Sequence, residues 1–178
     1  QDTGFAKDEL ITIPLNMHVG QGIYNEKFDV FAEELKIYPG IKNVTLGYSS
    51  PSSIDIGDSY PDWEGRPEDK KVEMFWCPVS YNYFETLGLQ IIEGRSFSKE
   101  FPSDEVNWQE RTSNYILNKK AVLEMGISDP IGKEFEIYGF KGQIVGIVED
   151  YNFKSLHSEI SPLYLQVNPT FLHEIIVR

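Results

Sequence analysis

The chain has 178 residues and a net charge of −12, from 28 acidic and 16 basic side chains. Its basic residues are scattered, whereas nucleic acids and anionic membrane surfaces are bound by clustered positive charge, so the composition argues against both partners. Hydrophobic residues make up 40% and aromatic residues 13% of the chain, which is typical of a folded domain and not of a disordered segment.

The sequence shows no sign of a membrane segment of its own. Its longest apolar run, "IVGIV" at 144–148, is far shorter than the roughly 20 residues that a membrane-spanning helix needs. The single cysteine, Cys77, lies in strand-like sequence, where we expect a buried apolar side chain and not a reactive thiol. Because the chain lacks an initiator Met and ends on the strand-like "EIIVR", we expect a soluble piece of a larger protein.

The first 49 residues predict a strand, a helix and a second strand. "LITIPL" at 10–15 is rich in β-branched residues and stops at Pro14, which predicts a strand. From Tyr24 apolar residues recur every three or four positions, which predicts an amphipathic helix that ends at Pro39-Gly40. The apolar stripe comprises Tyr24, Phe28, Phe31, Leu35 and Tyr38. "IKNVTLGYS" at 41–49 alternates like a strand, which completes a βαβ-like unit.

Residues 51–70 predict a long exposed acidic loop. They contain three prolines and six acidic side chains against two basic ones, and Tyr60 and Trp63 are their only aromatic residues. The carboxylates between Asp55 and Gly65 suggest calcium as an alternative, but the prolines and the spacing do not match an EF-hand loop. We therefore expect a solvated acidic loop without a specific metal.

The stretch "VSYNYFETLGLQIIEGRSFS" at 79–98 predicts the end of a strand, a short helix and another strand. Ser80 is the predicted N-cap of the helix and Gly88 its C-terminal stop. Tyr83, Phe84 and Leu87 form a short apolar face, and the segment contains no histidine or cysteine. These residues indicate packing and not catalysis.

The second half predicts a mainly β region with one short helix. Residues 99–112 form a second charged loop with Phe101 and Trp108, and "SNYILN" at 113–118 predicts a strand. Asn118 is the predicted cap of a helix that Gly126 ends, and strands follow up to residue 170. A last strand starts with "EIIVR".

The catalytic and nucleotide-binding patterns in the chain are incomplete. Gly20-Gln21-Gly22 lies between a strand and a helix, but Asn25 replaces the third glycine of a dinucleotide fingerprint. His157 lies between Ser155 and Glu159, yet residues two apart on an extended loop do not converge on one substrate. A hydrolase around His157 is therefore a weak alternative, and we expect no cofactor.

Four segments resemble the periplasmic core domain of MacB/FtsX-like bacterial ABC transporter permeases. They are "GFAKDELITIPL", "PVSYNYFETLGLQIIEGRSFS", "YILNKKAVLEMGISDPIGKEFEI" and "GQIVGIVEDYNFKSLHSEISPLYLQV". Together they cover nearly the whole chain in the family's order. The resemblance implies an α+β fold, with a porter-like βαβ subdomain and an inserted, mainly β second subdomain. Residues 1–95 plus 171–178 would form the first, possibly incomplete at its C-terminus, and residues 96–170 the second.

The resemblance also implies a function and partners. The chain would be a non-catalytic extracytoplasmic domain on the periplasmic face of the bacterial inner membrane, in a parent protein that is integral to the membrane. It would transmit ATP-driven motion to export a substrate or to act on a partner protein. The implied partners are the transmembrane segments of the same permease, a separate cytosolic ATPase, a second permease copy or paralogue, and a periplasmic adaptor. The alternative is a calcium- or ligand-binding extracytoplasmic module that uses residues 51–70.

Partner contacts are expected on the aromatic residues of the two charged loops. Large aromatic side chains in charged surroundings often anchor interfaces. The candidates are Tyr60, Trp63, Phe101 and Trp108. The alternative is that these side chains pin their loops to the body of the domain.

Overall fold

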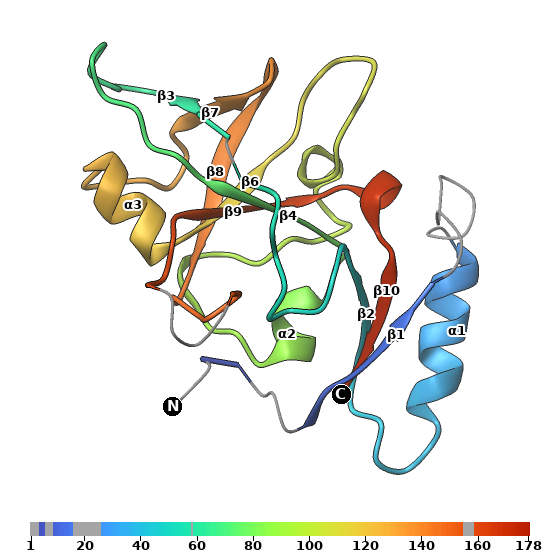
Figure 1. Cartoon of the computed structure of the whole chain (residues 1–178). Coiled ribbons are helices and arrows are strands. Elements are labelled where there is room, and N and C mark those ends of the chain that lie inside the picture. Colours follow the sequence, from blue (N-terminus) through green and yellow to red (C-terminus); the bar gives the residue numbers. More distant parts are fainter. Residues whose placement is uncertain (1–3, 6–8, 16–25, 58, 155–158) are drawn as a thin grey trace.

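The computed structural model describes residues 4–5, 9–15, 26–57, 59–154 and 159–178, in which ten strands form one mixed sheet (Figure 1). The strands are β1 (Ile11–Pro14), β2 (Val44–Gly47), β3 (Asp62–Trp63), β4 (Phe75–Val79), β5 (Ile91–Gly94), β6 (Tyr115–Asn118), β7 (Glu134–Ile137), β8 (Phe140–Val148), β9 (Leu163–Val167) and β10 (Glu174–Val177). The helices are α1 (Glu26–Lys36), α2 (Tyr83–Leu87) and α3 (Lys119–Met125), with 3-10 turns η2 (Pro102–Asp104) and η3 (Pro169–Phe171). The predicted mixed fold of strands and few helices is confirmed.

The order of strands in the sheet places the chain's last strand beside its first. The order is β1-β10-β2-β4-β9-β6-β8-β7-β3, and β5 also pairs with β8. β10 runs antiparallel to both neighbours, with Ile176 opposite Thr12 of β1 and Thr45 of β2. β1 and β2 are therefore parallel, and β1-α1-β2 is a βαβ unit into which β10 is inserted. The predicted strand at "EIIVR" is confirmed.

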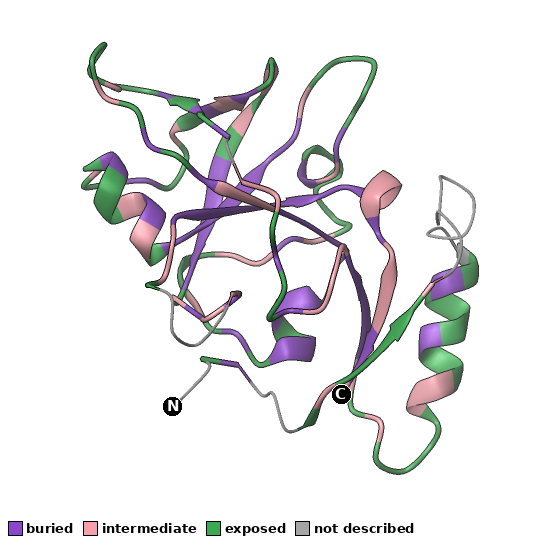
Figure 2. Ribbon diagram, viewed as in Figure 1, coloured by how far each residue is buried: buried purple, intermediate pink, exposed green. Residues whose placement is uncertain are grey.

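Helix α1 covers this end of the sheet with a narrow face (Figure 1). Phe28 and Ala32 are buried against Val44 and Leu46 of β2. The predicted apolar stripe is wrong in part, because Phe31 is 40% exposed and Tyr38, beyond the end of the helix, is 65% exposed. Tyr24 lies outside the described residues. The helix contacts the sheet only along one edge of its stripe, so its outer side chains stay in solvent (Figure 2).

The middle strands are buried on both faces (Figure 2). Along β9, Leu163 and Leu165 pack into the core beneath α2, whereas Tyr164 points into the core beneath α3. Along β6, Ile116 and Leu117 divide between the same two cores. A strand that is covered on both faces reads as a continuous apolar run without alternation, which explains sequences such as "YILN" and "LYLQV".

The start of α2 differs from the prediction, and its end agrees. The N-cap is Asn82, in the left-handed region at φ 62°, and its side chain makes no capping hydrogen bond. Ser80 is not the cap, because its hydroxyl lies 2.7 Å from the hydroxyl of Thr45 and accepts a hydrogen bond from the Leu46 amide at 2.8 Å. Gly88 ends the helix at φ 70°, as predicted.

Helix α3 has the predicted capping residues at both ends. The Asn118 side-chain oxygen accepts a hydrogen bond from the Ala121 amide at 2.9 Å, which satisfies one of the free donors of the first turn. Gly126 adopts φ 71° at the C-terminus, a conformation that costs other residues free energy. The local sequence is therefore sufficient to place this helix.

The prediction that residues 51–70 form an exposed loop is wrong in part. β3 pairs with β7, with Trp63 opposite Phe135. Trp63 is only 5% exposed, and Ile54 is also buried, with its amide donating to the Phe153 carbonyl at 3.0 Å. The loop is held to the body because these two apolar side chains pack in the core. The acidic composition of the loop gives no sign of this packing.

Strands from the two predicted subdomains share the sheet. β4 pairs with β9 in parallel, and β5 pairs with β8. β3, from the first predicted range, pairs with β7 from the second. The boundary between residues 95 and 96 therefore stays a prediction.

Candidate functional surfaces

Two of the four predicted contact residues, Tyr60 and Trp63, lie just before and within β3. Tyr60 is 54% exposed and its hydroxyl donates a weak, 3.5 Å hydrogen bond to the Glu73 carboxylate. Trp63 is buried in the core beneath α3, with the Arg66 guanidinium 5.8 Å from its ring centre. Tyr60 thus presents its ring to solvent, whereas Trp63 holds its segment to the body.

The other two predicted contact residues lie in the loop 99–112 and are about half exposed. The Arg95 guanidinium stacks 3.9 Å above the centre of the Phe101 ring. The Trp108 ring meets Phe140 edge to face at 5.1 Å. Phe101 is 43% and Trp108 46% exposed, so one side of each ring is available to a partner. That the four aromatics contact a partner stays a prediction.

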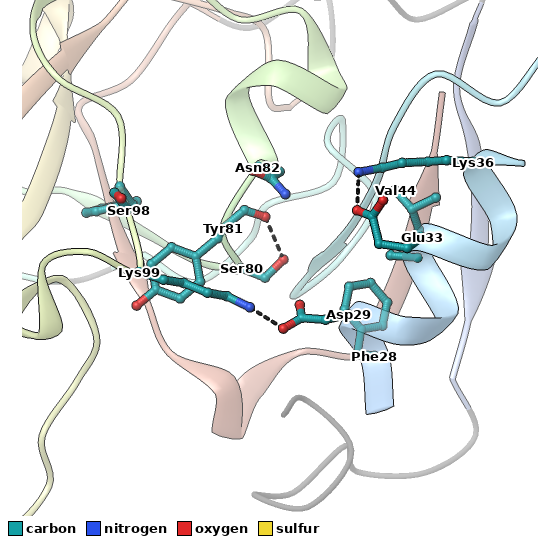
Figure 3. Close-up of a pocket in the computed structure, with 12 residues that line it drawn as sticks. Phe28, Asp29, Glu33, Lys36, Val44, Ser80, Tyr81, Asn82, Ser98 and Lys99 are labelled. Atoms are coloured by element: carbon teal, nitrogen blue, oxygen red, sulfur yellow. Dashed lines mark hydrogen bonds and ion pairs between the residues drawn. The ribbon is translucent and has the colours of Figure 1, made fainter. Parts of the chain in front are cut away.

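A cleft of about 300 Å³ separates α1 from the segment 80–99 (Figure 3). Ser80 lines the cleft, and its hydroxyl lies 2.7 Å from that of the buried Thr45 and donates to the Tyr81 carbonyl at 3.2 Å. An ion pair between Asp29 of α1 and Lys99 crosses the opening. This cleft was not expected from the sequence, because Asp29 and Lys99 are 70 positions apart and belong to no motif.

The wall of the cleft near Lys99 carries a partly buried acid–phenol pair. The Tyr81 hydroxyl donates to the Glu105 carboxylate at 3.4 Å, and the Lys99 ammonium lies 5.7 Å from the Tyr81 ring centre. Burial raises the pKa of Glu105, against the opposing effects of the Tyr81 hydrogen bond and the Lys99 charge. Burial likewise raises the pKa of Tyr81. The charges that line the cleft are thus largely paired with one another. An exposed pair such as Asp29–Lys99 contributes only about 0–1 kcal/mol to the stability of the fold.

Acidic side chains gather where the loop 51–70 meets β7. They line a hollow of about 220 Å³ and comprise Asp62, Glu64, Glu134 and Glu136. Each is paired with a cation: Arg66 lies 2.7 Å from Asp62, Lys133 3.9 Å from Glu64, and Lys141 within 3.8 Å of both other carboxylates. The hydrogen bond from Arg66 lowers the pKa of Asp62. Within the described ranges no group of three or more His, Cys, Asp or Glu side chains could hold a metal ion.

The catalytic and nucleotide-binding candidates fall largely outside the described structure. His157 and Ser155 lie in the undescribed segment 155–158, and Gly20-Gln21-Gly22 lies in 16–25. His173 is described, and its ring lies edge to face with Tyr48 at 5.6 Å. The hydrolase alternative around His157 is thus untested by the geometry.

The described helices are all too short or too polar to cross a membrane. The start of β1 and the end of β10 lie side by side, since Ile11 pairs with Val177. The chain therefore enters and leaves the sheet at the same end.

Comparison with known proteins finds similarity in structure only. No family model and no curated protein matches the chain. The periplasmic region of MacB from Actinobacillus actinomycetemcomitans matches with a TM-score of 0.58 over 98% of this chain and 76% of that one, at 16% identity. The extracellular domain of the noncanonic ABC-type transporter YknZ from Gram-positive bacteria matches with a TM-score of 0.51 over 95% of this chain and 81% of that one, at 16% identity.

A third solved structure gives the same result. It is a domain from a Porphyromonas gingivalis protein assigned as a permease, with a TM-score of 0.51 at 15% identity. The match covers 83% of this chain and 60% of that one. At these low identities, the TM-scores show a shared fold over 83–98% of this chain.

Proposed function

We propose that this chain, which has the fold of the periplasmic and extracellular domains of MacB-type ABC transporters, is the extracytoplasmic domain of such a permease. The observation that carries the proposal is the match to the MacB periplasmic region over 98% of the chain. The antiparallel pairing of Ile11 with Val177 supports it. A domain between two neighbouring membrane helices must return the chain to the point of entry, and this pairing does so.

In this role the domain carries out no chemistry and moves as a lever. ATP hydrolysis by a separate cytosolic ATPase would shift the transmembrane segments of the permease, and these would pull on β1 and β10. The paired strands would pass the movement to the sheet, whose central strands are buried on both faces and deform little. A second permease copy or paralogue and a periplasmic adaptor complete the proposed assembly. The movement would export a substrate or act on a partner protein.

The first test is the sequence of the whole gene. We expect hydrophobic spans of about 20 residues shortly before residue 1 and after residue 178. A complete reading frame without such spans would contradict the proposal.

The second test places the domain relative to the membrane by cysteine labelling in intact cells. Leu123 on α3 is 73% exposed, so Leu123→Cys gives an accessible thiol on the folded domain. We expect a membrane-impermeant maleimide to label this variant of the full-length protein without permeabilisation of the inner membrane. Labelling that requires permeabilisation would place the domain in the cytosol and overturn the proposal.

The unmodified protein is the matched control for this experiment. Cys77 is 2% exposed, and burial raises the pKa of its thiol to about 12. The folded parent domain should therefore give no background signal before denaturation. Signal that is equal in the parent and the variant would show unfolding and not topology.

A further inference from the structure

A small aromatic pocket lies at the junction of β4, β9, the β7–β8 turn and the loop that carries Trp108. Its volume is about 240 Å³. Trp76 comes from β4, Phe140 from the start of β8 and Phe171 from η3, so the walls join segments far apart in the sequence. Trp108, which is 46% exposed, stands at the mouth.

The walls of the pocket are rings that support one another. Trp76 meets Phe171 at 5.1 Å between ring centres, and Trp108 meets Phe140 at 5.1 Å, both edge to face. Trp108 also lies 6.3 Å from Phe171. Such ring contacts are favourable beyond the area that they bury, so the rings stabilise one another in the positions that bound the pocket. A space bounded by fixed rings fits a flat apolar ligand.

Two residues that line the pocket each carry a buried polar atom without a hydrogen-bond partner among the described residues. The atoms are the indole nitrogen of Trp76, a donor, and the side-chain oxygen of Asn168, an acceptor, and neither is exposed to the pocket until its side chain turns. Asn168 is only 2% exposed. A buried polar group without a partner is unfavourable, and a ligand with one acceptor and one donor would pair with both atoms after a small rotation of these side chains.

The rim of the pocket is held in an unusual backbone conformation. Tyr138 has φ 52°, and the Arg111 guanidinium donates to its carbonyl. The Tyr138 hydroxyl lies 3.4 Å from the hydroxyl of Ser59. A positive φ is strained for tyrosine, and such strain is often found at functional sites.

The pocket contains no charge. All ten described residues that line it are uncharged, in a chain whose net charge is −12. Its volume is below the roughly 300 Å³ at which pockets for drug-sized ligands begin, so it accommodates one or two rings. We propose that this pocket binds an uncharged, planar aromatic molecule of one or two rings that offers one hydrogen-bond donor and one acceptor.

The proposal is tested on the purified chain by titration calorimetry with benzamide, which has one ring, an acceptor carbonyl and a donor amide. We expect saturable binding of one molecule per chain with a dissociation constant on the order of 1 mM, as suits a ligand of this size. Benzoate has the same shape and a negative charge, and it should bind at least about ten-fold more weakly because a charge is costly in this wall. Absence of saturation by about 10 mM benzamide, or equal binding of benzoate, would overturn the proposal.

Three variants separate the pocket from other sites. Trp108→Ala removes the ring at the opening of the pocket and should weaken benzamide binding at least about five-fold. Phe101→Ala, in the same loop and equally exposed, lies outside the pocket and should leave binding unchanged. Trp76→Phe keeps a ring but removes the donor, so it should weaken binding of benzamide more than that of toluene.

Circular dichroism establishes that each variant is folded before titration. Unchanged benzamide affinity in both Trp108→Ala and Trp76→Phe would contradict the assigned site. The benzamide titration does not depend on the proposed permease function. Its result and that of the cysteine-labelling experiment therefore test the two proposals separately.

Discussion

The thiol of Cys77 on β4 lies 3.8 Å from the phenolic oxygen of Tyr83 on α2, and both side chains are buried. Burial raises the pKa of the Cys77 thiol to about 12, which outweighs the opposing effect of the neighbouring Tyr83 and Tyr151 phenols. The contact joins the sheet to the helix that the sequence marked as ordered but without catalytic groups. The Cys77 thiol therefore packs in the core, and a reagent reaches it only when the domain unfolds.

We therefore expect Cys77 to react with a maleimide only when the domain opens. At pH 8 the native protein should be labelled at least about 100-fold more slowly than the protein in concentrated guanidinium chloride, since the thiolate is the reacting species. The measurement is the labelling rate by mass spectrometry in both states. Fast labelling of the native protein would show that α2 does not stay packed on β4.

The two tryptophans of the charged loops should respond differently to replacement by alanine. Trp63→Ala removes a ring packed beneath α3 and should lower the free energy of unfolding by about 3–5 kcal/mol. Trp108→Ala removes a half-exposed ring and should cost less than about 1.5 kcal/mol. Urea denaturation of both variants measures the difference, and similar costs would mean that Trp108 is a core residue as well.

This contrast shows what the sequence can and cannot predict. Both tryptophans lie in charged, proline-containing loops, and both were therefore expected at the surface. Trp63 is buried because it pairs with Phe135, 72 positions later, and no local pattern reports such a partner. Ser80 is a similar case, since its hydroxyl lies beside that of Thr45 and not at the start of α2.

Local signals predicted other features well. Gly88 and Gly126 end their helices because a left-handed residue is needed there, and the chain places glycine at both positions. The strand predicted at "SNYILN" is β6, although its central place in the sheet was not predicted. The aromatic pocket escaped prediction because β4, β8 and η3 each contribute one ring, and their meeting depends on the order of strands in the sheet.

A buried ion pair fixes the loop 99–112 to the sheet. The Arg95 guanidinium donates two hydrogen bonds to the Asp104 carboxylate, at 2.6 and 2.9 Å, and Asp104 is completely buried. Asp104 also accepts from the Ser98 amide and the Asn114 side chain. Arg95→Met should destabilise the protein by about 3–5 kcal/mol, because it leaves the Asp104 charge buried without its cation.

The control for this variant is Lys36→Met, which removes one end of an exposed i, i+3 pair with Glu33. It should change stability by no more than about 1 kcal/mol. Chemical denaturation of both proteins provides the comparison. A loss for Arg95→Met as small as that of the control would mean that the hydrogen bonds from Ser98 and Asn114 suffice to hold Asp104 without its cation.

The last prediction concerns the pH dependence that Glu174 contributes at the end of the sheet. One carboxylate oxygen of Glu174 is buried without a hydrogen-bond partner among the described residues, and burial raises the pKa of this group above its ordinary 4.5. The folded state thus binds the proton more tightly than the unfolded state. The resulting stabilisation is complete below about pH 4.5 and is lost as the pH rises through the raised pKa.

Glu174→Gln imitates the protonated acid at every pH. It should therefore stabilise the domain at pH 7, by less than about 1 kcal/mol because the group is only partly buried, and have no effect at pH 4. Urea denaturation of both proteins at the two pH values measures this. A variant that is less stable than the parent at pH 7 would contradict this prediction. It would show that the folded protein stabilises the Glu174 charge, and that the carboxylate helps to hold β10 between β1 and β2.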